Sequence, residues 1–200
     1  MGLVLLYDSA ISGNCYKVRL LFSLLGVEYE RREVSVIDRS NRAELLGDLN
    51  PGLRVPTLVL DDGRPLAESD AILVYFAEDT EYLPSDRYER AQVLQWMFFE
   101  QYSHEPNIAV LRFWAHAGIE PNPRDALAKF NGGHAALEAM ERHLSDRDFL
   151  VGDGVTIADL ALYAYTHVAD EAGFEMVRVP AVAAWLTRIA ALPGYVPIDA

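Results

Sequence analysis

The hydrophobic and polar positions of the first eighty residues alternate between strand-like and helix-like patterns. Leu3–Tyr7 is an apolar run with the length and character of a strand buried on both faces. Tyr16–Leu25 repeats apolar residues at three- and four-residue steps, and Gly26 follows where a glycine commonly ends a helix. Tyr29–Val36 indicates an edge strand or a half-exposed strand, and Ser40–Leu49 indicates a weaker helix.

A hairpin and a further helix complete this half of the chain. Thr57–Leu60 and Arg64–Leu66 lie on either side of Asp61-Asp62-Gly63, a turn sequence typical of a β-hairpin. Ser69 is expected to cap the helix that follows. The resulting order, βαβαββα, predicts an α/β domain over residues 1–80 in which helices cover the faces of a small mixed sheet.

After residue 80 the pattern is helical throughout. Residues 81–87 contain proline, serine and aspartate and are expected to form a linker, and residues 88–200 are expected to form an all-helical domain. Pro106 is expected to kink or end the helix predicted at Tyr88–Glu105. The stripe predicted on that helix comprises Ala91, Leu94, Met97, Phe98 and Tyr102. Later helices are predicted at Arg124–Leu144, Thr156–Ala169 and Pro180–Leu192.

The composition narrows the class of protein. The 200 residues include 17 Lys and Arg against 30 Asp and Glu, a formal net charge of −13. This excess of acidic residues argues against binding to nucleic-acid phosphates or to an anionic membrane surface. The single cysteine, Cys15, excludes an internal disulfide framework and a cysteine-rich zinc site, and no metal site is expected. With no signal peptide at the start, a cytoplasmic location is expected.

Three short segments carry candidate chemistry, and the first lies between the first strand and the first helix. Ser12 and Asn14 place a hydroxyl and an amide beside the N–H groups at the positive end of a helix. Such a place stabilises an anion, including a thiolate. The alternative is that Ser12 or Asn14 only caps the helix.

The other two segments suggest a site for an extended ligand with an amino-acid head group. Pro56 directly precedes a strand, which is typical of an entry point with a cis bond that turns the Val55 backbone outward. Ser69 and the N–H groups of the last helix of this half could hold a carboxylate, while Glu68 could hold an ammonium beside it. The alternative is a helix cap with an acidic first turn.

The joint occurrence of these segments resembles the cytosolic glutathione transferase family. The resemblance covers nearly the whole chain and rests on residues 3–26, 50–56, 66–72 and 149–162. It implies a thioredoxin-like first half that binds glutathione as co-substrate, followed by a helical second half that lines a pocket for a small hydrophobic electrophile. It also implies a homodimer, and the chemistry that it implies needs no metal.

The resemblance also implies roles for individual residues. Ser12 matches the serine or threonine that donates a hydrogen bond to the glutathione sulfur, and Asn14 matches an assisting asparagine. Cysteine-using classes place their cysteine where this chain has Asn14, so Cys15 is expected not to be the nucleophile, although a one-residue shift of the alignment would restore it. The glutathione-binding positions are Arg54, Val55, Pro56, Glu68 and Ser69, and the helix-capping pair, taken as structural, is Thr156 and Asp159.

The second-substrate pocket is the least transferable part of the resemblance. Its candidates lie near Pro106 and are Phe99, Tyr102, His104, Asn107 and Phe113. Aromatic residues at helical spacing can equally be core residues. Two other activities stay open: glutathione-dependent reduction of a disulfide, and a non-catalytic interaction module on the same fold.

Overall fold

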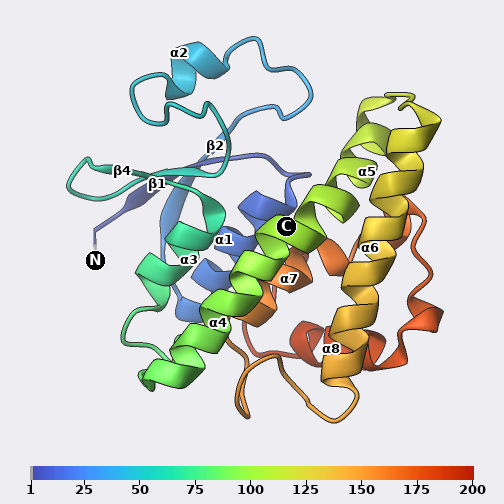
Figure 1. Ribbon diagram of the computed structural model, residues 1–200. Helices are drawn as coiled ribbons and strands as arrows, with labels where there is room; N and C mark the ends of the chain where they lie inside the picture. The colour runs from blue at the N-terminus through green and yellow to red at the C-terminus, as the bar shows by residue number, and fades with distance from the viewer. Residues whose placement is uncertain (1) are drawn as a thin grey trace. The chain divides into compact units, whose positions relative to one another are not determined.

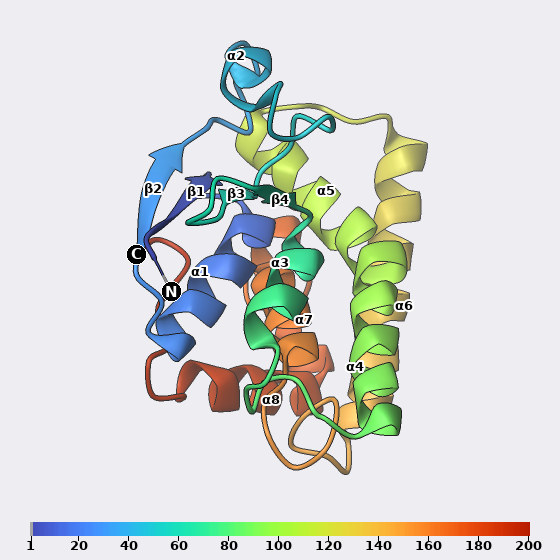
Figure 2. The ribbon, with the colours of Figure 1, turned by 90° about the vertical axis from the view of Figure 1, so that its left-hand side faces the viewer.

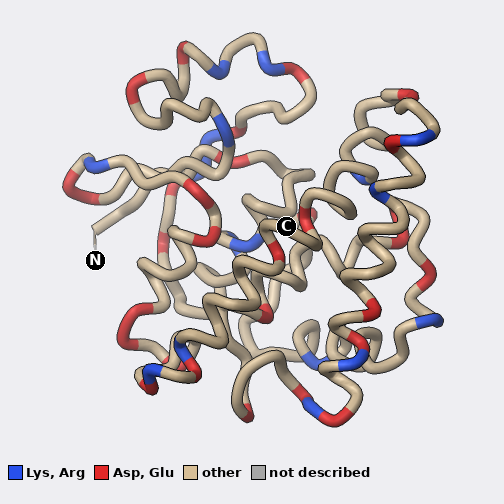
Figure 3. The backbone as a smooth tube through the Cα atoms, viewed as in Figure 1, with Lys and Arg blue, Asp and Glu red and all other residues tan. Residues whose placement is uncertain are grey.

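The computed structural model describes residues 2–200, which form two compact units (Figure 1). Unit 1 spans the chain up to Glu78 and also takes in Pro193–Ala200, and unit 2 is Asp79–Leu192. Within residues 2–200, every helix is too short or too polar to cross a membrane. Acidic and basic positions are interspersed along both units (Figure 3).

Unit 1 has the predicted βαβαββα order. Its elements are β1 (Val4–Asp8), α1 (Gly13–Leu25), β2 (Tyr29–Glu33), α2 (Arg42–Leu46), β3 (Thr57–Val59), β4 (Pro65–Ala67) and α3 (Ser69–Ala77). The sheet order is β2-β1-β3-β4, with β1 parallel to β2 and β3 antiparallel to both β1 and β4. The predicted mixed sheet and the edge position of β2 are therefore confirmed, as expected of a thioredoxin-like domain.

The helices of unit 1 cover both sides of this sheet. Helices α1 and α3 lie together on one side, and α2 lies on the other (Figures 1 and 2). The Phe22 ring of α1 meets the Phe76 ring of α3 edge to face, 4.6 Å apart. Helix α1 ends at Gly26, whose φ of 65° is the left-handed conformation that the sequence predicts for this glycine.

The start of α3 corrects one expectation. Glu68, not Ser69, occupies the N-cap position, with a φ of 69°, and its side chain makes no capping hydrogen bond. Ser69 is the first residue of the helix, so the expectation that it caps α3 is wrong. The Ser69 hydroxyl instead faces Asn14 and Lys17 of α1.

Unit 2 is helical, as predicted. Its elements are α4 (Arg87–Phe99), the π-helix η1 (Glu100–His104), α5 (Glu105–Ala117), α6 (Pro123–Leu144), α7 (Ile157–Thr166), the 3₁₀ turns η2 (Ala169–Ala172) and η3 (Met176–Arg178), and α8 (Pro180–Ala190). The helix does not stop at Pro106, because the wider π turn just before it accommodates a residue that has no N–H to donate.

Of the stripe predicted on α4, only Met97 is buried. The buried side chains of α4 are Val93, Trp96 and Met97, whereas Phe98 is 69% exposed and Tyr102, in η1, is 87% exposed. Two apolar stripes fit the helical period here, and the one that carries Phe98 and Tyr102 faces away from the core of unit 2.

Close packing explains the two glycines inside α6. A Cβ atom on Gly133 would lie 2.3 Å from the Phe174 ring, and one on Gly132 would lie 2.7 Å from the Asn107 side chain. The predicted capping box of α7 is confirmed: Asp159 accepts from the Thr156 N–H at 2.8 Å. The buried Asp159 carboxylate also accepts from the Trp185 indole N–H at 2.9 Å, which supports its structural role.

The segment Pro193–Ala200 departs from the predicted organisation. It follows the last helix, yet it packs with unit 1, where the Ser23 hydroxyl donates to the Gly194 carbonyl at 2.7 Å and the Tyr16 hydroxyl donates to the Val196 carbonyl at 2.7 Å. These bonds use backbone carbonyls and therefore leave no pattern in the sequence of the segment.

Candidate functional site

The first part of the candidate site is the turn between β1 and α1. Ser12 is the N-cap of α1, and its Oγ accepts a hydrogen bond from the Cys15 N–H at 3.3 Å. The capping interpretation is therefore confirmed for Ser12. It leaves the hydroxyl hydrogen free to donate, because a hydroxyl can accept and donate at once. The half-exposed Ser12 hydroxyl can thus meet an anion at the positive end of α1.

A chain of polar side chains joins this turn to the start of α3. The Ser69 hydroxyl donates to Oδ1 of Asn14 at 3.3 Å, and the Lys17 ammonium donates to Ser69 Oγ at 3.4 Å. Lys17 also forms an ion pair with Asp70 at 3.0 Å, and its side chain is completely buried. Sequence reasoning missed the role of Lys17, although a lysine three residues after Asn14 lies on the same side of a helix.

Cys15 lies in the interior and not at the surface of the site. It is fully buried and belongs to a core cluster that includes Tyr7 and Val55. Burial raises the pKa of its thiol well above the usual value, and the nearby Asp8 carboxylate raises it further. A buried, protonated thiol is a poor nucleophile, which supports the expectation that Cys15 is not the attacking group.

The start of α3 offers groups of both signs to a ligand. The Glu68 carboxylate is exposed, and within residues 2–200 it has no hydrogen-bond or ion-pair partner. The Glu68 side chain does not cap the first N–H groups of α3, which lie at the positive end of the helix. This end of unit 1 can therefore hold an ammonium beside a carboxylate, as the sequence predicts for an amino-acid head group.

The segment before β3 presents free backbone. The Val55–Pro56 peptide bond is cis, as predicted. Neither the Val55 N–H nor its carbonyl has a hydrogen-bond partner in the described part of the chain. Nearby, Asn50 and Thr57 side chains donate to the Arg54 carbonyl at 3.0 and 2.7 Å, while the Arg54 guanidinium is exposed.

The five pocket candidates of unit 2 do not share one environment. His104 is completely buried and hydrogen-bonded to Thr166 at 2.9 Å, and Asn107 donates to the Ser103 carbonyl at 2.7 Å while packing against α6. Tyr102 is highly exposed, and Phe99 and Phe113 are half-buried. Their assignment to a pocket stays a prediction. Across residues 2–200, no group of three or more His, Cys, Asp or Glu side chains could hold a metal ion.

Comparison with known families matches both halves of the chain. The family profile "Glutathione S-transferase, N-terminal domain" matches residues 11–79, and the profile "Glutathione S-transferase, C-terminal domain" matches residues 94–193. A glutathione S-transferase-like protein LUC7 from Fusarium sp is 32% identical, over 92% of this chain and 86% of its own length.

Two solved structures illustrate the range of similar folds. A glutathione S-transferase from Pseudomonas fluorescens is 45% identical with a TM-score of 0.94, covering 98% of this chain and 99% of its own. A glutathione transferase homolog from Lodderomyces elongisporus, solved with two GSH per subunit, is 23% identical with a TM-score of 0.88, covering 97% and 96%. The second likeness concerns the fold alone.

Proposed function

This chain belongs to the glutathione S-transferase family, and from that premise we propose that it activates glutathione as a thiolate for attack on a hydrophobic electrophile. The observation that carries the proposal is the set of unpaired groups in unit 1. They match glutathione group by group: the Glu68 carboxylate suits its ammonium, the start of α3 suits its γ-glutamyl carboxylate, and the free Val55 backbone suits its extended peptide.

Thiolate formation is assigned to the β1–α1 turn. An ordinary thiol has a pKa of about 8.5, and hydrogen bonds to the charged form together with a helix N-terminus can lower it to about 7. Ser12 would donate to the sulfur, with Asn14 assisting. The thiolate then forms a C–S bond with the electrophilic carbon, the leaving group departs with its electron pair, and the thiol proton passes to solvent.

Membership of the glutathione S-transferase family supports glutathione as the co-substrate. The exposed guanidinium of Arg54 is proposed to meet the tripeptide backbone. Ser69 would contribute its hydroxyl to the γ-glutamyl site while Lys17 holds it in place. The hydrophobic electrophile is assigned to Phe99, Tyr102, His104, Asn107 and Phe113 on the family resemblance.

The test measures the ionisation of bound glutathione. Thiolate absorbance is followed against pH with the wild type, Ser12→Ala, Ser12→Thr and Asn14→Ala. We expect Ser12→Ala to raise the pKa of the bound thiol by about one unit, from about 7 to about 8, which at neutral pH removes roughly four-fifths of the thiolate, while Ser12→Thr keeps both hydroxyl and cap. Wild-type conjugation of an aryl halide by the Ser12→Ala, Asn14→Ala double variant would overturn the site.

Ser35→Ala is the matched control. The Ser35 hydroxyl also accepts from backbone N–H groups in unit 1, those of Ile37 and Asp38, but it lies outside the candidate site. The same preparations are assayed for reduction of a small disulfide, in which two glutathione molecules become one disulfide. Faster disulfide reduction than conjugation would favour the reductase alternative, and failure to bind immobilised glutathione would favour the interaction module.

The proposal includes a homodimer and a cytoplasmic location. The family resemblance supports the dimer, and unit 2 has an exposed apolar stripe that could take part: Tyr88 is 71%, Phe98 69% and Tyr102 87% exposed. Sedimentation of the wild type and of Phe98→Asp tests it, since a charge in a dimer interface would shift the protein to monomer. The lone cysteine supports a reducing compartment.

A further inference from the structure

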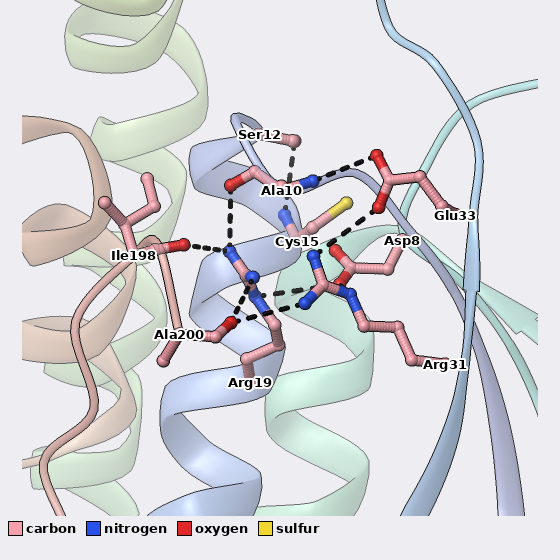
Figure 4. A network of polar contacts seen from close by, with 9 residues as sticks. All are labelled: Asp8, Ala10, Ser12, Cys15, Arg19, Arg31, Glu33, Ile198 and Ala200. Atoms are coloured by element: carbon pink, nitrogen blue, oxygen red, sulfur yellow. Dashed lines mark hydrogen bonds and ion pairs between the residues drawn. The ribbon is translucent and has the colours of Figure 1, made fainter.

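The segment Pro193–Ala200, called the strap below, lies along α1 of unit 1 and is held through its backbone (Figure 4). Ser23 and Tyr16 donate to the carbonyls of Gly194 and Val196, each at 2.7 Å. Arg19 donates to the Ile198 carbonyl at 2.8 Å and to the Ala200 oxygen at 3.4 Å.

The pattern of these bonds is regular on both partners. The four acceptors are every second residue of the strap, which turns at 193–194 and again at 198–199, where the Ala200 N–H donates to the Pro197 carbonyl at 3.2 Å. The three donors, Tyr16, Arg19 and Ser23, follow the helical spacing of a single face of α1. All four acceptors are main-chain oxygens, so the contact with α1 does not depend on the side chains of the strap.

Arg19 extends this contact to the turn that carries Ser12. Its Nη2 atom, which binds the Ile198 carbonyl, also donates to the Ala10 carbonyl at 3.1 Å. Its Nε lies 3.7 Å from the Asp8 carboxylate at the end of β1. Arg19 is 3% exposed and Asp8 is completely buried, so these groups face one another away from solvent.

Both backbone polar groups of Ala10 are thereby held in place. Its carbonyl accepts from Arg19, and its N–H donates to the Glu33 carboxylate of β2 at 3.2 Å. Arg31 of β2 completes the cluster by pairing with both Asp8 and Glu33. Ala10 lies two residues before Ser12, whose own N–H donates to the Ser9 carbonyl at 3.0 Å. Figure 4 shows the cluster beneath this turn.

We propose that Arg19 is a positioning residue for the Ser12 hydroxyl, that it acts through the Ala10 carbonyl, and that the strap holds Arg19 in place. The inference rests on the proposed role of Ser12 in thiolate formation. A planar guanidinium donates in several fixed directions at once, which lets one side chain join the strap, the turn and Asp8. A small misplacement of a group that contacts the reacting atom costs up to about a hundredfold in rate.

The first test uses Arg19→Lys, which keeps a buried charge near Asp8 but cannot span the Ala10 and Ile198 carbonyls in the same way. We expect a higher pKa for the thiol of bound glutathione and kcat for aryl-halide conjugation lower by about tenfold or more. The KM for glutathione should change by less than about twofold, because the γ-glutamyl site at α3 is untouched.

Arg188→Met is the matched control. Arg188 of unit 2 also donates to two backbone carbonyls, those of Arg147 and Asp148, at 3.5 and 3.0 Å. Its loss should lower the melting temperature without moving the thiol pKa. A merely structural role for Arg19 predicts the same result for Arg19→Lys, so an unchanged thiol pKa and kcat in folded Arg19→Lys would overturn the proposal.

A second variant keeps the proposal testable if Arg19→Lys does not fold. Tyr16→Phe combined with Ser23→Ala removes two anchors of the strap and leaves Arg19 intact. We expect a smaller rise of the thiol pKa in the same direction, and an unchanged value in the folded double variant would overturn the role of the strap. If the wild type does not lower the pKa of the glutathione thiol, the proposed function fails. If the wild type lowers it and the Arg19 and strap variants lower it equally, only the role of Arg19 and the strap fails.

Discussion

The ammonium nitrogen of Lys17 lies 3.0 Å from the carboxylate of Asp70, and the Lys17 side chain has no exposed surface. The pair joins the N-terminal parts of α1 and α3, the two helices whose N-termini form the candidate glutathione site. A buried lysine is tolerated only when its charge is paired. The pair therefore binds the two ends of the site to each other, with the Ser69 hydroxyl beside it.

Replacing Lys17 by methionine tests this connection. Asp70 would lose its partner and Ser69 a neighbour, so we expect the free energy of unfolding to fall by about 3 kcal/mol, the lower end for a broken buried pair because Asp70 is partly exposed. The KM for glutathione should also rise. Urea unfolding and steady-state kinetics measure the two effects. Lys129→Met, in α6, is the matched control and should change stability by less than about 0.5 kcal/mol.

Variants of Glu68 should change glutathione binding and protein stability independently. Its φ of 69° lies in the left-handed region that favours glycine. Glu68→Gly should therefore keep or raise the free energy of unfolding, by about 1 kcal/mol, while weakening glutathione binding by loss of the carboxylate. Calorimetric titration and thermal unfolding check both. Glu68→Gln should weaken binding without the gain in stability, and unchanged binding in both variants would exclude the ammonium-binding role.

Cys15 should not react with thiol reagents in the folded protein. Burial, and then the Asp8 carboxylate, raise the pKa of this thiol above its ordinary value of 9.0. The folded state therefore keeps the proton at pH values where the unfolded thiol loses it, and stability should decline as the pH rises above 9. A colorimetric thiol assay at pH 8 should detect one thiol only after addition of urea. Rapid labelling of the native protein would contradict this.

His167 should make the protein more labile in acid. Burial lowers the pKa of its imidazole below 6.5, while its Nδ1 donates to the Tyr163 carbonyl at 2.8 Å. The unfolded state therefore binds a proton that the folded state does not, and the free energy of unfolding should fall as the pH drops below 6.5. Urea unfolding at pH 7.5 and 5.5 measures this change. The difference in the free energy of unfolding between the two pH values should be smaller for His167→Gln than for the wild type or for the control His134→Gln.

Local signals were sufficient for most of the fold. Gly26 ends α1, Asp61-Asp62-Gly63 joins β3 to β4, and Pro56 follows a cis bond, because each of these features depends on residues that are neighbours in sequence. The inward face of α4 was predicted correctly at Met97 and wrongly at Phe98, because periodicity cannot choose between two apolar stripes on one helix. Burial of Trp96 and exposure of Phe98 are set by what packs against the helix.

The supporting shell of the candidate site was beyond sequence reasoning for the same reason. The segments at Ser12, Val55 and Glu68 could be identified from the sequence by their residue types and by their positions at the ends of helices and strands. Lys17 and Arg19 look like ordinary polar positions of α1 until their partners are known, and those partners, Asp70 and Ile198, lie far along the chain. Every residue has a backbone carbonyl that can accept a hydrogen bond, so the sequence does not show that the carbonyl of Ile198 is the one that Arg19 binds.

The strap also fixes the order of events during synthesis. Unit 1 begins to emerge from the ribosome first, yet its last segment, Pro193–Ala200, is translated only after all of unit 2. The nascent unit 1 therefore lacks the carbonyls of the strap to which Arg19, Tyr16 and Ser23 of α1 later donate. The turn that carries Ser12 acquires this support only once residues 193–200 have been made, so a chain stalled within unit 2 would display the candidate site residues without the contacts that fix them.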